Sequence, residues 1–250
     1  KRDSFGNILI FKAFLIRILG VLTHRRFRGI NHLLIEGSKI LQHLPDKNVL
    51  FISNHQTYFA DVTAMLHVFN ASLNGRVNSL KNISYLKKPK LNIYYIAAQE
   101  TMNSGLLPKI LSYTGAISIS RTWKDRNKKI YRNINKKDIN NIYTALKNGW
   151  LITFPQGTTK PWSPIRKGTA HMIKENKPII IPIIIDRFRR SFDKTGIKLK
   201  KKGIRQTLKI KEALKIDYEN DSLEKITEKI SYAIEQHIDF KKIISTPLTT

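Results

Sequence analysis

Short apolar segments alternate with helical segments along most of this 250-residue chain, and that alternation restricts the fold more than any other feature. Apolar strands of this length are usually buried on both faces of a sheet. Because they alternate with helices, we expect one α/β domain with a mixed, partly parallel central sheet flanked by helices. The predicted strands are residues 31–36, 49–53, 92–98, 115–120, 150–154, 178–185 and 206–211, and the predicted helices are residues 61–70, 103–113, 136–148, 166–175 and 222–238.

Residues 8–23, ILIFKAFLIRILGVLT, form the most apolar stretch of the chain. It is shorter than the roughly 20 residues that span a bilayer, and no cleavage site of a signal peptide follows it. An apolar helix followed by arginines is typical of a segment in the membrane interface, although a helix packed on the core is the alternative. We therefore predict a membrane-docking segment over residues 1–30, followed by the single α/β domain over residues 31–250. The predicted membrane-facing residues are Phe11, Lys12, Phe14, Arg17, Arg25, Arg26 and Arg28.

The charge of the chain predicts an anionic partner. Lysine and arginine number 45 against 18 acidic residues, which gives a formal net charge of +27. Such a surface attracts anionic membranes, an acidic protein or nucleic acid. The sequence has no recognition helix, zinc-ligand spacing or aromatic and basic RNA motif that would favour nucleic acid. It also has no cysteine, which excludes a disulfide scaffold and thiol catalysis.

The segment SNHQTYFADV, residues 53–62, carries a histidine and an aspartate where a predicted strand meets a predicted helix. A neutral imidazole can accept a proton, and a nearby carboxylate can fix its tautomer. His55 and Asp61 are therefore a candidate catalytic pair. The alternative is that Asp61 only caps the helix that it opens.

Three further segments place chemically useful groups at strand ends, where the sites of α/β sheets gather. GAISISRTW, residues 115–123, ends in Arg121, which can clamp a phosphate or carboxylate. LITFPQGTTKPW, residues 151–162, contains a Pro-x-Gly turn whose backbone N–H groups can bind an oxyanion. KPIIIPIIID, residues 177–186, has two prolines that predict an edge strand or irregular pairing, and it either lines an apolar groove or belongs to the core.

Together and in this order, the four segments resemble the glycerolipid acyltransferase family, which includes the lysophosphatidate acyltransferases. The blocks of that family, N-H-x4-D, G-x5-R, F-P-E-G-T-R and a proline-framed apolar run, correspond here to NHQTYFAD, GAISISR, FPQGTT and PIIIPIII. The stretch IRKGTAH, residues 165–171, is similar to the start of the helix after the third block. The resemblance covers roughly residues 30–190.

The resemblance implies transfer of an acyl group from acyl-CoA or acyl-carrier protein to the hydroxyl of a lysolipid. His55 would deprotonate the hydroxyl, Asp61 would orient His55, and backbone donors near Gly157 would stabilise the oxyanion. It implies no metal and no cofactor beyond the acyl donor, and a peripheral or monotopic location at the cytoplasmic face of the inner membrane. The implied partners are an anionic membrane surface, the lysolipid and the acyl-carrier protein, without nucleic acid.

Two departures from the family pattern change what we expect of the site. Five residues separate His55 from Asp61 instead of four, so the chain between them must bulge if the carboxylate is to reach the imidazole. The third block has Gln156 in place of glutamate and Thr159 in place of arginine, which favours a lyso-aminolipid as an alternative acceptor or a family member that binds lipid without catalysis. The predicted substrate-binding residues are Arg121, Gln156, Gly157, Thr158, Thr159, Lys160 and Lys167.

Overall fold

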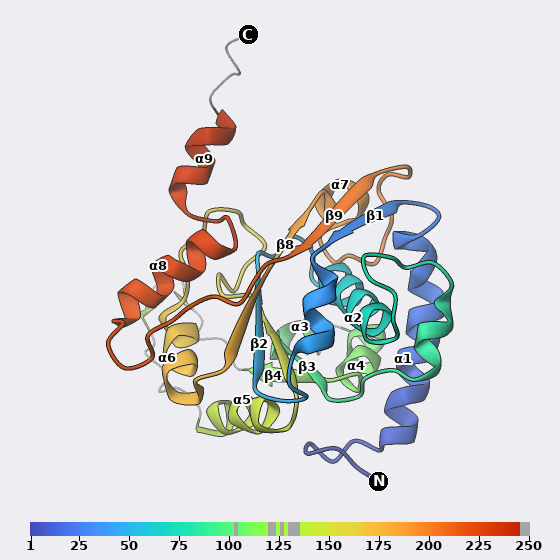
Figure 1. Ribbon diagram of the computed structural model, residues 1–250, viewed down its shortest axis with the longest axis horizontal. Helices are drawn as coiled ribbons and strands as arrows, with labels where there is room; N and C mark the ends of the chain where they lie inside the picture. The colour runs from blue at the N-terminus through green and yellow to red at the C-terminus, as the bar shows by residue number, and fades with distance from the viewer. Residues whose placement is uncertain (103–104, 120–123, 126–127, 130–135, 246–250) are drawn as a thin grey trace.

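The computed structural model describes residues 1–102, 105–119, 124–125, 128–129 and 136–245, and its centre is a seven-stranded sheet (Figure 1). The strand order is β1-β9-β8-β2-β7-β3-β4, and every neighbouring pair is parallel except β8 with β9. This confirms the predicted mixed sheet, with strand ends shifted by no more than one residue. The strands are β1 (His32–Glu36), β2 (Val49–Ser53), β3 (Ile93–Ala98), β4 (Ala116–Ile119), β7 (Trp150–Thr153), β8 (Ile179–Asp186) and β9 (Arg205–Ile210), and a separate antiparallel pair is formed by β5 (Lys124–Asp125) and β6 (Lys128–Lys129).

Helices cover both faces of the sheet. The predicted C-terminal helix is divided in two, because Glu235 has a left-handed backbone (φ 54°) that an α-helix does not accommodate. The last helix projects away from the sheet (Figure 1). The helices are α1 (Leu9–Phe27), η1 (Ser38–His43), α2 (Ala60–Leu73), η2 (Ile83–Lys87), α3 (Gln99–Met102), α4 (Leu106–Ser112), α5 (Lys136–Asn148), α6 (Lys167–Asn176), α7 (Phe188–Ser191), α8 (Leu223–Ala233) and α9 (Ile238–Ser245).

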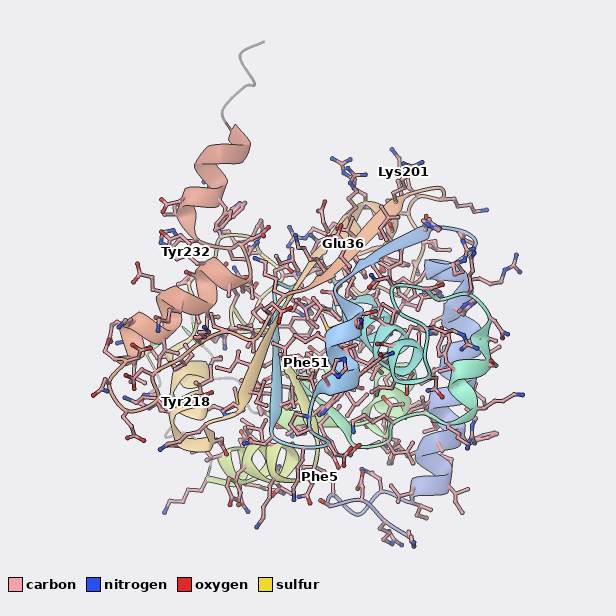
Figure 2. All side chains as sticks on the ribbon, viewed as in Figure 1. Phe5, Glu36, Phe51, Lys201, Tyr218 and Tyr232 are labelled. Carbon is pink, nitrogen blue, oxygen red and sulfur yellow. The ribbon has the colours of Figure 1, made fainter. Side chains whose placement is uncertain are left out.

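The run VLFIS of β2 is apolar throughout because each of its faces lies in a separate part of the core. Val49 and Phe51 pack with α2 and with the end of α1, whereas Leu50 and Ile52 pack with α5, α6 and α8. Phe51 lies near the centre of the molecule (Figure 2). The fold is therefore a three-layer α/β arrangement in which a central parallel strand needs no polar face.

The proline-framed strand β8 lies between β9 and β2, so the prediction of an edge strand is wrong and that of irregular pairing is confirmed. Its first part pairs with β2, and its antiparallel pairing with β9 starts only at Ile183. The carbonyl of Pro182 accepts a hydrogen bond from the N–H of Lys211, just beyond the end of β9. Because β9 has already ended at this position, the absence of an N–H group on Pro182 removes no hydrogen bond between β8 and β9.

Lys12, predicted to face the membrane, is instead fully buried. Its Nζ lies 3.1 Å from Oδ2 of Asp3 and 4.6 Å from the ring centre of Tyr94. Burial lowers the pKa of Lys12, and the carboxylate of Asp3 opposes that effect. The helix places Lys12 one turn from Ile16, on the face that packs against the domain.

The outer face of α1 is apolar and exposed. Six side chains on it are between 40% and 79% exposed, and Arg25 continues the same face at the C-terminal end of the helix. No helix among the described residues is both long and apolar enough to cross a bilayer. The six apolar residues are Ile10, Phe11, Phe14, Ile18, Val21 and Leu22.

A buried histidine attaches α1 to the layer formed by α2 and η2. His67 contacts the hydroxyl of Tyr85 through Nδ1 at 2.8 Å and that of Thr23, on α1, through Nε2 at 2.9 Å. Burial lowers the pKa of His67 to about 3, and the neighbouring His24 acts in the same direction. Between about pH 3 and pH 6.5, His67 is therefore neutral in the folded protein but protonated in the unfolded chain.

We expect the free energy of unfolding to fall as the pH drops from about 6.5, the ordinary pKa of histidine in an unfolded chain, toward 3. His67 contributes a slope of at most about 1.4 kcal/mol per pH unit, because the unfolded state alone binds its proton in this range. Urea unfolding between pH 7 and 4.5 should show a shallower slope for His67→Asn than for the wild type. His43→Asn, at an exposed position on η1, is the control, and equal slopes for wild type and His67→Asn would contradict the prediction.

Candidate active site

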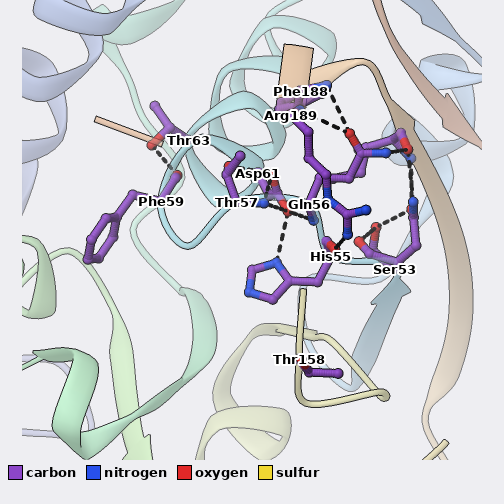
Figure 3. A network of polar contacts seen from close by, with 12 residues as sticks. Ser53, His55, Gln56, Thr57, Phe59, Asp61, Thr63, Thr158, Phe188 and Arg189 are labelled. Atoms are coloured by element: carbon purple, nitrogen blue, oxygen red, sulfur yellow. Dashed lines mark hydrogen bonds and ion pairs between the residues drawn. The ribbon is translucent and has the colours of Figure 1, made fainter. Parts of the chain in front are cut away.

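His55 and Asp61 are in direct contact, which confirms the contact that the sequence predicted (Figure 3). His55 follows the end of β2, and Asp61 lies in the first turn of α2. The distance from Nδ1 of His55 to Oδ2 of Asp61 is 2.8 Å. The aspartate side chain is fully buried and that of the histidine is 12% exposed. A buried carboxylate thus meets a histidine that still reaches the surface of the site.

The chain between the two residues bulges around the carboxylate of Asp61. Its oxygens accept hydrogen bonds from the backbone N–H groups of Gln56 (2.6 Å) and Thr57 (3.0 Å) and from the hydroxyl of Thr57 (2.7 Å). The residue in the N-cap position of α2 is Phe59, so Asp61 lies inside the helix and reaches back to the preceding loop. The extra residue is absorbed in this loop.

The ring of His55 is fixed on two sides. Phe154 stacks on it with ring centres 3.9 Å apart and an interplanar angle of 19°. Because the carboxylate of Asp61 only accepts hydrogen bonds, its contact requires the proton of a neutral imidazole to be on Nδ1. Nε2 is then an acceptor, on the part of the ring turned away from Asp61 (Figure 3).

The loop after β2 is attached to the end of β8, 131 positions further along the chain. The side chain of Asn54 donates to the carbonyl of Ile185 (2.8 Å) and accepts from its N–H (2.9 Å). The guanidinium of Arg189 donates to the carbonyl of His55 (3.2 Å), and Gln56 accepts from the N–H of Arg189. The sequence prediction missed Arg189, since nothing in a basic loop distinguishes an arginine that turns inward from its neighbours.

A cavity of about 880 Å³ opens beside His55. Its walls come from the ends of β3 and β7 and from α5 and α6, and they are largely apolar, with Asp138, His171 and Glu175 also on the lining. This volume lies in the range of ordinary ligand sites. No residue of β8 lines it, so the proline-framed strand belongs to the core and not to a groove. Apolar lining residues include Ile96, Ala97, Met102, Ile139, Ile142 and Met172.

The third block forms a tight turn on the wall of this cavity. Gly157 lines the cavity, but its N–H donates to the carbonyl of Phe154 (2.8 Å) and is therefore engaged. Gln156 is buried and does not line the cavity. Its Nε2 donates to the carbonyl of Ser163 (2.9 Å) and to Oε1 of Gln236 (3.2 Å) between α8 and α9. The side chain of Gln156 thus joins the third block to the segment between α8 and α9.

Two of the predicted cations, Lys160 and Lys167, lie outside the cavity wall, and Arg166 lies on it. Lys160 is exposed, and Nζ of Lys167 forms an ion pair with Glu224 (2.8 Å). Arg166 lines the cavity, where its guanidinium donates to the carbonyls of Gln156 and Gly157, each at 3.3 Å. Arg166 belongs to the stretch IRKGTAH that resembles the family, but the predicted substrate-binding residue was its neighbour Lys167.

The other predicted substrate-binding residues have mixed outcomes. Thr158 follows Gly157 on the turn (Figure 3), and neither Thr158 nor the half-buried Thr159 lines the cavity. Arg121, the arginine of the second block, lies outside the described residues.

Comparison with known proteins places the chain in a family. A family model described as Acyltransferase matches residues 35–186, which include the His55–Asp61 pair and the third block. No curated protein matches the sequence. A similar solved structure is that of the 1-acyl-sn-glycerophosphate (LPA) acyltransferase PlsC from Thermotoga maritima, with 16% identity, a TM-score of 0.57, and coverage of 94% of this chain and 80% of that chain. That likeness shows the shared fold, and the family match spans more than half of the sequence. The chain belongs to the acyltransferase family of acyl-transferring enzymes.

Proposed function

We propose that the protein transfers a fatty acyl group from a thioester, acyl-CoA or acyl-carrier protein, to the hydroxyl of a lysolipid, with His55 as the general base. The observation that carries this proposal is the contact of the buried carboxylate of Asp61 with His55, which lines a largely apolar cavity. The cavity suits an acyl chain, and the histidine on its wall is the base that the reaction needs.

In the proposed reaction, Nε2 of His55 takes the proton of the lysolipid hydroxyl as its oxygen attacks the thioester carbonyl. Asp61 stabilises the imidazolium that forms. The tetrahedral intermediate collapses with cleavage of the carbon–sulfur bond, and the imidazolium returns the proton to the leaving thiolate. A thioester is already activated, so positioning and one base account for the chemistry.

For the oxyanion of the intermediate, we propose the backbone N–H of Thr158 as a donor. The N–H of Gly157 is engaged within the turn, and Thr158 directly follows this glycine, which lines the same cavity as His55. The guanidinium of Arg166 fixes this turn through the carbonyl of Gly157. A backbone donor fixed before the substrate binds stabilises developing charge without reorganisation.

The acceptor is proposed to be lysophosphatidate or a lyso-aminolipid. The similar enzyme from Thermotoga maritima is an acyltransferase of 1-acyl-sn-glycerophosphate, which supports the first. Thr159, in place of an arginine, supports the second, because a cation that would pair with a phosphorylated acceptor is missing at that position. Among the described residues, Arg166 is the cation that remains on the cavity wall.

A crossed assay tests the function. The purified protein is given radiolabelled acyl-CoA or acyl-carrier protein together with lysophosphatidate or a lyso-aminolipid in vesicles. Transfer to either acceptor, well above the rate without enzyme, supports the proposal, and the better acceptor decides between the two. Absence of transfer in all four combinations would refute it.

We propose that the protein works as a peripheral protein on the cytoplasmic face of an anionic inner membrane. The exposed apolar face of α1 would enter the interface, and Arg25 would lie among the headgroups. The basic loop over residues 186–205, where Lys201 projects beside other nitrogen-bearing side chains (Figure 2), would attract headgroups, CoA phosphates or an acidic carrier protein.

The double variant Phe14→Glu, Val21→Glu should bind vesicles that contain phosphatidylglycerol at least about tenfold more weakly than the wild type. Both side chains are more than half exposed on the outer face of α1, and a large apolar side chain contributes about 1.5–3 kcal/mol when buried. Vesicle flotation measures the binding, and Ile238→Glu, on exposed α9, is the matched control. Equal flotation of the double variant and the control would contradict the proposed membrane face.

A further inference from the structure

The turn formed by residues 193–198, after α7, packs against the lengthened stretch between His55 and Asp61. We infer that this 193–198 turn is a positioning element for the pair, an inference that rests on the proposed role of His55 as the base. The turn would compensate for the extra residue that distinguishes this chain from the family pattern.

The first support is a pair of backbone hydrogen bonds to the extra-long stretch. The N–H of Tyr58 donates to the carbonyl of Lys194 (3.1 Å), and that of Phe59 donates to the carbonyl of Thr195 (2.9 Å). Tyr58 and Phe59 immediately precede α2, where backbone N–H groups have no partner within a helix. The bulge therefore takes its shape from a segment more than 130 residues away in the sequence.

The second support is the rigidity of the turn itself. Oδ1 of Asp193 accepts hydrogen bonds from the N–H groups of Gly196, Ile197 and Lys198, each at 3.0 Å, and its Oδ2 accepts from the hydroxyl of Thr195 (2.7 Å). Burial raises the pKa of the Asp193 carboxyl, but these hydrogen bonds outweigh it and the pKa is lowered. The ionised carboxylate of Asp193 thus holds the turn in the shape that presents the carbonyls of Lys194 and Thr195 to the bulge.

The third support is a close backbone approach at Gly196. Its φ is +81°, and a Cβ atom placed there would lie 2.5 Å from the backbone nitrogen of Ala60 and 2.9 Å from Oγ1 of Thr57. That same hydroxyl donates to Oδ1 of Asp61 at 2.7 Å. One atom added to the turn would therefore push on a group that holds the carboxylate. Displacements of about 1 Å in a catalytic group can cost about 100-fold in rate.

Gly196→Ala is the direct test, and Gly203→Ala is its matched control. Both glycines have positive φ, 81° and 73°, so alanine strains both backbones, but a Cβ at Gly203 meets nothing within 4 Å. We expect Gly196→Ala to lower kcat at least about tenfold with KM little changed, because the apolar walls that β3, α5 and α6 contribute to the cavity do not contact this turn. Gly203→Ala should keep the wild-type kcat. Equal kcat values for the two variants would overturn the inference.

Variants of Asp193 keep the inference testable if Gly196→Ala does not fold. Asp193→Ala removes the acceptor of three N–H groups and should lower kcat, whereas Asp193→Asn keeps one oxygen acceptor and should restore most of it. Asp217 closes a similar turn by accepting from the N–H groups of Glu219 and Asn220. Asp217→Ala should therefore leave kcat unchanged, and a loss in Asp193→Ala no greater than that in Asp217→Ala would refute the inference.

A spectroscopic readout separates this inference from the proposed function. The proton on Nδ1 of His55, hydrogen-bonded to Asp61, should give an NMR resonance in the wild type and in Gly203→Ala and should lose it in Gly196→Ala. If this pattern of resonances is found but the wild type transfers no acyl group, the proposed function is refuted and the positioning role of the turn is supported. Retention of the resonance and of kcat in Gly196→Ala would overturn the turn's role alone.

Discussion

Replacing His55 with alanine should lower kcat/KM for acyl transfer by about 100- to 10,000-fold, the usual contribution of a positioned general base. The imidazole is fixed by Asp61 at 2.8 Å and by the stacked ring of Phe154. Alanine cannot accept the proton of the lysolipid hydroxyl, and water has no comparable orientation toward it. The rate should be measured at saturating and limiting acceptor, so that loss in kcat is distinguished from weaker binding.

His171→Ala is the matched control for this prediction. His171 also lines the cavity but is not one of the groups that the carboxylate of Asp61 contacts. A histidine in the cavity should therefore be dispensable unless it is paired with the buried acid. Full acyl transfer by a folded His55→Ala protein, checked by circular dichroism, would exclude His55 as the base.

Asp61→Asn should also lower kcat, by a factor comparable to that for His55→Ala, and should reduce the free energy of unfolding by about 1–3 kcal/mol. The carboxylate accepts from His55 and from three donors on Gln56 and Thr57. An amide has one oxygen for these donors, so its NH₂ group must face another donor inside a fully buried site. Either His55 or the donors of Gln56 and Thr57 then lose their hydrogen-bond acceptor.

The measurement is kcat together with urea unfolding, and Asp46→Asn is the control. Asp46 is an exposed aspartate that accepts from Lys90 and Asn92, so its amide variant loses little. If Asp61→Asn kept its kcat while His55→Ala lost activity, the histidine would act without help from the carboxylate.

The strands and the histidine–aspartate contact were predictable because their causes are local or ordered along the chain. VLFIS is apolar on both faces, as a central strand must be. The bulge between Gln56 and Ala60 followed from the spacing of two residues that had to meet. The family order of the four blocks then favoured the hypothesis of a catalytic pair over that of a simple helix cap.

Sequence prediction was least informative for residues whose surroundings are set by segments far away in the chain. Because α1 is apolar on nearly all sides, its periodicity does not show which face is buried, and Lys12 was placed on the wrong one. The contact of Gln156 with Gln236, 80 positions later, has no signal in the local sequence. Arg166 and Lys167 are adjacent basic residues, and only the three-dimensional turn decides that the first lines the cavity.

The order of the strands has a consequence for how the protein is made. The neighbour of β1 in the sheet is β9, and the contact between Asn31 and Ile204 beside them joins residues 173 positions apart. At roughly 5–20 residues per second, a ribosome needs about 10–35 seconds to cover that interval. During this time the apolar α1 and β1 have emerged without the last strand of the sheet. A nascent chain therefore exposes the apolar side chains of α1 well before the enzyme can fold.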